Sequence, residues 1–155
     1  MGCGSQGNGS LVSCSDLDEI VGRMNPPELT ETPSFSAAEV APRDPLSLSV
    51  SVNEYTTRVS LDVRSVDRQS APSVPSRDTD GAETIVFPIS TAGLPPGLYL
   101  ARYIGLSDEI RPDTSFYSTW NPDGTYRLGA QFGPEGSRQC PTDIPVASFT
   151  VVASD

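Results

Sequence analysis

The chain has 155 residues and a formal net charge of -10, with 20 acidic residues against 10 basic ones. It contains no histidine, and all of its basic residues are arginines. Catalysis that needs a histidine base or a lysine nucleophile is therefore excluded. The acidic balance also argues against nucleic acid as a partner, because phosphate binding depends on clustered Lys and Arg. The length suits one domain with a single core.

The N-terminal part predicts an arm followed by a short helix. Residues 1–14 are rich in Gly, Ser, Asn and Gln, a composition that cannot support a core. Over residues 15–24, Asp16 can cap a helix and Glu19 completes a capping box. So short a helix must pack its apolar side on the rest of the chain or on a neighbouring subunit. The apolar side chains expected to contact partner subunits are Leu11, Val12, Leu17, Ile20, Val21 and Met24.

The same N-terminal residues lack the basic and apolar regions of a secretory signal. No run of apolar residues is long enough to span a membrane, so we expect no membrane span. The three cysteines, Cys3, Cys14 and Cys140, form an odd set. Either they stay reduced, or Cys3 and Cys14 close a small loop that tethers the arm. A zinc site is disfavoured because no histidine can complete the ligands, and we expect no metal.

Alternation of apolar and polar residues predicts half-buried β-strands in the middle of the chain. Leu46 to Val52 alternates with serines, and Val59 to Val63 repeats the pattern. Residues 67–82, rich in Ser, Pro, Asp and Arg, predict a long loop. Thr84 to Ser90 returns to strand, and Pro88 favours a sheet edge or a bulge there, because proline donates no backbone N–H.

Gly93 to Leu106 joins a rigid turn to the strand with the strongest signal. Pro96 holds its φ angle, and Gly97 adopts backbone conformations without a Cβ penalty. With side chains alternating across the strand, each face can be assigned. The assignment places Leu98, Leu100, Ile104 and Leu106 on one face, interrupted by the polar Arg102, and Tyr99 on the other.

The last part predicts a hairpin and a closing strand. Thr114 to Trp120 and Thr125 to Phe132 flank the tetrapeptide Asn-Pro-Asp-Gly at 121–124. Its proline at the second position and glycine at the fourth favour a type I turn closed by a glycine bulge. Residues 133–145 predict another loop, and Val146 to Val152 predicts the final strand.

Three segments resemble bacterial and phage immunoglobulin-like domains. Residues 27–50 look like the opening of such a domain, and residues 94–103 and 148–152 are similar to its last strands. The resemblance covers about residues 28–155 and implies an immunoglobulin-like antiparallel β-sandwich. It also implies a corner made by Pro96, Gly97 and Tyr99, in which the tyrosine hydroxyl bonds back to the backbone. Arg43 and Asp44 depart from the glycine turn common in the family, and the motifs imply a fold and no activity.

Few residues suggest chemistry. Asp108 with Glu109, and Asp78 with Asp80, are the candidate carboxylate pairs, but both fall in predicted loops where solvated charge is the ordinary interpretation. Residues 76–81 begin like a calcium loop, yet Phe87 stands where the twelfth-position acid belongs, so a plain turn is expected.

The hairpin aromatic residues offer two interpretations. They form a ligand platform, as in carbohydrate-binding modules, or they pack the hairpin on the rest of the domain. These residues are Phe116, Tyr117, Trp120 and Tyr126.

Taken together, the sequence predicts a non-enzymatic structural or interaction subunit without catalytic residues or cofactor. Residues 1–27 are the attachment segment, and residues 28–155 the sandwich, from which hairpin 114–132 protrudes. The expected setting is a bacteriophage virion, as a capsid decoration protein or similar accessory bound to other subunits of a larger assembly. The alternatives are an extracellular surface or filament subunit and a carbohydrate-binding module.

Overall fold

The computed structural model describes residues 11, 27–67, 69–108, 114–132 and 138–153. These residues form β-strands and no helix, arranged in two sheets, which confirms the all-β prediction. The helix expected over 15–24, and the arm apart from Leu11, lie outside the described residues. Within the part described, no helix is long and apolar enough to cross a membrane.

The smaller sheet contains β1 (Ser34–Phe35), β3 (Leu46–Ser51) and β6 (Thr84–Ile89), paired antiparallel in the order β1-β3-β6. In β6, buried residues alternate with exposed ones, as period-two patterning requires. β6 lies at the edge of this sheet, which is one of the two placements predicted from Pro88. On this strand Arg77 Nη1 donates a hydrogen bond of 2.7 Å to the carbonyl of Val86. The missing N–H of Pro88 and the hydrogen bond from Arg77 both hinder pairing of this edge with another chain.

The larger sheet is built around β7 (Gly97–Ser107), the longest strand. β4 (Arg58–Ser65) pairs along one edge of β7. The opposite edge is divided, because β11 (Ser148–Val151) pairs with the first residues of β7 and β8 (Thr114–Trp120) with the last. β7 therefore connects the body of the sandwich with the hairpin.

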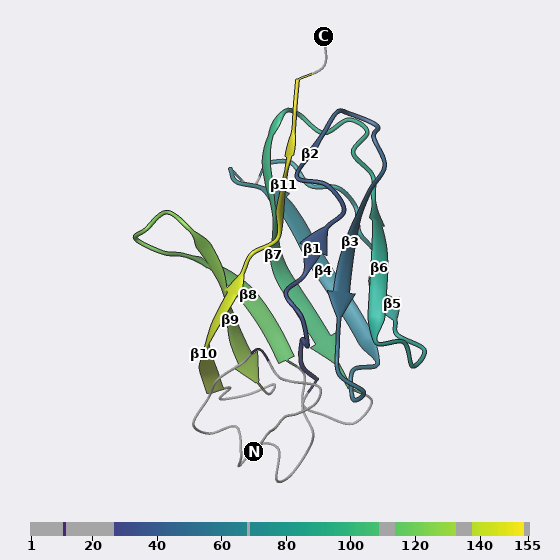
Figure 1. The fold of residues 1–155 in the computed structure, drawn as a ribbon, viewed down its shortest axis with the longest axis vertical. Helices are drawn as coiled ribbons and strands as arrows, with labels where there is room; N and C mark the ends of the chain where they lie inside the picture. Colours follow the sequence, from purple (N-terminus) through teal and green to yellow (C-terminus); the bar gives the residue numbers. More distant parts are fainter. Residues whose placement is uncertain (1–10, 12–26, 68, 109–113, 133–137, 154–155) are drawn as a thin grey trace.

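Four further strands complete this sheet. β2 (Glu39–Val40) runs parallel to β11, and β5 (Arg77–Asp78) pairs with β4. β9 (Tyr126–Phe132) and β10 (Arg138–Pro145) extend the sheet beyond β8, and the β8–β9 hairpin projects away from the other strands (Figure 1). The predicted hairpin is thus confirmed.

The loop predicted over 133–145 is wrong in its second half, where β10 forms. The pairing of β10 with β9 shifts register between Cys140 and Ile144. An irregular strand of this kind lacks the strict alternation by which a strand is recognised in a sequence. Both Cys140 and Ile144 are buried, so β10 contributes to the core in spite of its polar composition.

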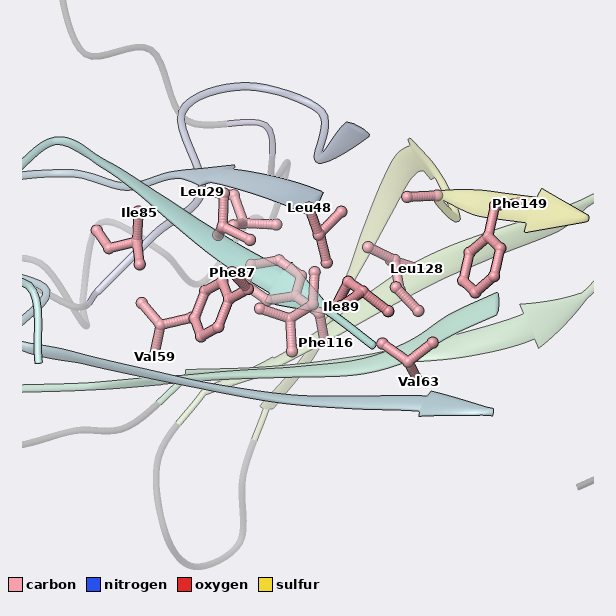
Figure 2. Packing of buried hydrophobic residues seen from close by; sticks show 14 of the residues in the cluster. Leu29, Leu48, Val59, Val63, Ile85, Phe87, Ile89, Phe116, Leu128 and Phe149 are labelled. Atoms are coloured by element: carbon pink, nitrogen blue, oxygen red, sulfur yellow. The ribbon is translucent and has the colours of Figure 1, made fainter. Parts of the chain in front are cut away.

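The core lies between the two sheets (Figure 2). Leu48 and Phe87 enter it from the small sheet, and Val59, Phe116 and Leu128 from the large one. Each of these side chains is at most 1% exposed. Burial of apolar surface of this kind is the main favourable term in folding.

The face assignment of β7 is corrected by the structure. Tyr99 and Ala101 point into the core together with Ile104 and Leu106, whereas Leu98 is 40% exposed. The cause is a register shift, since Asp62 of β4 pairs with Tyr103 but the next residue pairs with Ala101. The extra residue on β7 is Arg102, and an extra residue reverses the faces on one side of it.

The predicted tyrosine corner is present. Tyr99 Oη donates a 2.7 Å hydrogen bond to the carbonyl oxygen of Pro95, four residues upstream. The ring stacks on Phe149 of β11, with ring centroids 5.2 Å apart. Burial raises the pKa of the Tyr99 hydroxyl above its ordinary value of 10.0, so the hydroxyl remains a donor at neutral pH.

We expect Tyr99→Phe to lower the free energy of unfolding by about 1 kcal/mol, because it removes one hydrogen bond and leaves the packed ring in place. Urea denaturation monitored by circular dichroism measures the change. Tyr117→Phe is the matched control, since Tyr117 is 46% exposed and should leave stability unchanged. An equal loss in both variants would show that the Tyr99 hydrogen bond does not stabilise the fold.

The turn at Arg43 keeps a backbone conformation that usually requires glycine. Arg43 adopts a φ of 76°, a left-handed conformation that ordinarily favours glycine. The turn is closed by two hydrogen bonds, from Ala41 N to Asp44 Oδ2 at 2.9 Å and from Asp44 N to the carbonyl of Ala41 at 3.0 Å. The geometry of a glycine turn is therefore kept without the glycine.

Candidate functional site

The structure separates the four hairpin aromatic residues. Phe116 is 0% exposed and belongs to the core, so it cannot take part in an exposed platform. Trp120 of β8 lies directly opposite Tyr126 of β9, near the end of the hairpin. Tyr117 stands an odd number of residues from Trp120 on a regular strand, and therefore points to the other face. The four side chains therefore do not share one surface, and for Phe116 packing on the rest of the domain is the interpretation that the structure supports.

The hairpin turn holds Trp120 in an exposed position. Asn121 N donates to the carbonyl of Thr125 at 2.8 Å, and Gly124 has a φ of 90°, as a glycine bulge requires. The Asp123 carboxylate accepts hydrogen bonds from the hydroxyl and backbone N of Thr125, which hold its pKa below the ordinary 3.8. Trp120 remains 63% exposed beside this turn.

A shallow depression of about 500 Å³ lies on the face of the large sheet that points away from the core. We call it the outer-face depression. The residues that line it lie on three neighbouring strands, β4, β7 and β8. The lining residues are Asp62, Arg64, Arg102, Tyr103, Tyr117 and Ser118.

Two tyrosines form the aromatic part of the outer-face depression. Tyr103 and Tyr117 are paired across β7 and β8, with ring centroids 5.1 Å apart and planes inclined by 51°. The ring of Tyr103 lies over Gly105, where an added Cβ would come within 2.5 Å of the tyrosine oxygen. The absence of a side chain at Gly105 thus lets Tyr103 lie across the sheet surface next to Tyr117.

The two arginines of the outer-face depression differ in their hydrogen-bond partners. Arg64 Nε donates to both carboxylate oxygens of Asp62, at 2.9 and 3.1 Å. Arg102 lines the same depression, and among the described residues nothing pairs with its guanidinium through a hydrogen bond or an ion pair. Its position follows from the register shift in β7, since such irregularities redirect side chains. From the sequence, Arg102 was expected only to interrupt an apolar face of the strand.

The candidate carboxylates Asp78, Asp80 and Asp108 line a second surface hollow, which lies at the start of β4. Asp78 accepts a hydrogen bond from Arg58 Nη1 at 3.0 Å, with both side chains more than half exposed. Asp80 has a φ of 52° and forms a turn with Gly81, as the plain-turn interpretation predicts. Among the described residues, no three acidic or cysteine side chains are placed to hold a metal ion. Glu109 lies outside the described residues.

Cys140 is disulfide-bonded. Cys3 and Cys14, whose small loop was considered from the sequence, lie outside the described residues. The segment near Cys140 also contacts the one described residue of the arm, because Thr142 Oγ1 donates to the carbonyl of Leu11 at 3.1 Å. Leu11 packs against the core of its own domain. The other residues expected to contact partners, Val12, Leu17, Ile20, Val21 and Met24, lie outside the described part.

No protein-family model matches this chain, and the search of curated proteins gave no match either.

Proposed function

We propose that this protein is a non-enzymatic interaction subunit built on an immunoglobulin-like sandwich. The strand order supports the fold. Strands β1, β3 and β6 correspond to A, B and E of that fold, and β11, β7 and β4 to G, F and C. The tyrosine corner at the start of β7 stands where the family has it, at the start of strand F. The β8–β10 extension is then an insertion between strands F and G.

The observation that carries the interaction role is the exposure of Trp120. A tryptophan 63% exposed on a hairpin that projects from the domain suits the anchor of a protein interface (Figure 1). The hydrogen-bonded turn beside it fixes the backbone that carries this side chain, which reduces the entropy lost on binding. We assign the hairpin end, with Trp120 and Tyr126, as the surface that docks on other subunits of an assembly.

The disulfide of Cys140 supports a setting outside a reducing cytoplasm, because disulfides persist in secreted proteins and on cell and virion surfaces. We therefore propose an extracellular surface or filament subunit. A virion accessory protein is the second candidate, and the same disulfide is compatible with an exposed place on a virion.

Site-specific photo-crosslinking in the source organism tests the docking surface. With the crosslinking residue in place of Trp120, we expect one discrete adduct with a single protein. The same residue in place of Val86, which is 48% exposed on β6, is the control and should give no such adduct. Absence of an adduct at position 120, or identical adducts at both positions, would contradict the proposal.

A further inference from the structure

We propose that the outer-face depression binds a sugar that bears a single carboxylate, at the end or along a glycan. The site is separate from the hairpin surface, since Tyr117 and Trp120 lie on opposite faces of β8. It does not rest on the docking role proposed above, and one can be wrong while the other holds.

The first argument is the charge of Arg102. The domain is strongly acidic, with a net charge of -10, so an arginine without a described partner inside a depression is unusual for it. A guanidinium binds a carboxylate through paired, charge-assisted hydrogen bonds. Arg64 is already engaged by Asp62, so among the described lining residues Arg102 has the guanidinium that can bind a carboxylate. A polyanion would be repelled by the rest of the molecule.

The second argument is the aromatic surface beside that arginine. Tyr103 and Tyr117 present two rings whose centroids are 5.1 Å apart, and Gly105 lets the Tyr103 ring lie across the sheet. Aromatic rings combine an apolar face with a polar hydroxyl, which matches a pyranose ring with its apolar face and its hydroxyl rim. The oxygens of Asp62, oriented by Arg64, can accept hydrogen bonds from sugar hydroxyls.

The third argument is shape. The depression has a volume of about 500 Å³, within the range of small-molecule sites, but it is shallow and open. An open site on a sheet accommodates one or two rings of a longer glycan without enclosing the chain ends. Because strands β4, β7 and β8 all belong to one hydrogen-bonded sheet, the contacting side chains stand on a rigid base.

Titration calorimetry with the full chain tests the site. The probes are lactose capped with sialic acid and a disaccharide capped with glucuronic acid, each compared with its methyl ester. We expect binding of at least one acid, and an affinity for its ester weaker by about tenfold or more, because the ester removes the charge that Arg102 recognises. No binding of either acid, or equal affinity for acid and ester, would overturn the proposal.

Variants locate the site. Arg102→Ala should weaken binding by about tenfold or more, and Tyr103→Ala by about fivefold. Arg43→Gly is the charge-matched control, because it removes an exposed arginine elsewhere and glycine adopts the φ of 76° freely. Trp120→Ala should also bind normally. Loss of binding in Trp120→Ala with retention in Arg102→Ala would place the sugar on the hairpin and refute the assignment.

Discussion

Replacing Cys140 by alanine should lower the free energy of unfolding by about 2–4 kcal/mol, because it removes a native disulfide. Cys140 lies on β10, at the edge of the large sheet. In the chain-entropy account, such a cross-link stabilises by restricting the unfolded state, and long loops gain most. Urea denaturation of the variant, and of the unmodified protein with and without reductant, measures the loss.

A count of free thiols provides a control for this prediction. The chain has three cysteines and Cys140 is disulfide-bonded, so we expect one label per molecule after unfolding without reductant and alkylation. After reduction, three labels are expected. Replacing Cys3 and Cys14 one at a time should reproduce the loss of stability in one variant and leave the other unchanged. Three labels without reductant would contradict the disulfide itself.

Phe149→Ala should lower the free energy of unfolding by about 3–5 kcal/mol. Phe149 is 1% exposed, stacks on Tyr99 and meets Phe35 edge-on at 4.8 Å. It therefore links β11 and β7 of the large sheet with β1 of the small one. Removing the ring leaves a cavity between the sheets, whose cost adds to the lost burial.

Thermal unfolding should show a decrease of about 10 °C in the midpoint for Phe149→Ala. Phe149→Leu, which fills most of the space, should lose less than half as much and keeps the experiment informative if the alanine variant does not fold. Val152→Ala is the control at an exposed position of the following segment, where Val152 is 37% exposed, and should change little. A decrease in Phe149→Ala no larger than in Val152→Ala would mean that the two sheets do not pack through this ring.

Local patterns explain the agreement between sequence and structure. Strands β3 and β4 form where apolar and polar residues alternate, and β8 and β9 form on either side of a turn tetrapeptide. The Asn-Pro-Asp-Gly turn was also predictable, because its backbone angles demand these residue types locally. Tyr99 could be placed at a corner because the motif that contains Pro96, Gly97 and Tyr99 resembles the corner of immunoglobulin-like domains.

The failures occur where pairing between strands overrides the local pattern. Arg102 adds one residue to β7 relative to β4, and the side chains before it change faces. β10 was missed because its register shift removes alternation, although Cys140 and Ile144 are buried. For Phe116, a surface platform and packing on the domain both stayed open, because nothing in the sequence distinguishes a hairpin residue over the core from one beyond it.

The amino-acid sequence by itself determined the all-β class, the position of most strands, the hairpin turn, the acidic character and the exclusion of histidine and lysine chemistry. These properties depend on composition and on neighbours within a few residues. Only the tertiary structure decided which cysteine is cross-linked and which aromatic side chains are exposed. It also decided that Asp62, Arg102, Tyr103 and Tyr117 share one depression. Those properties arise from hydrogen-bonded pairing of distant strands, where a shift of one residue changes which side chains meet.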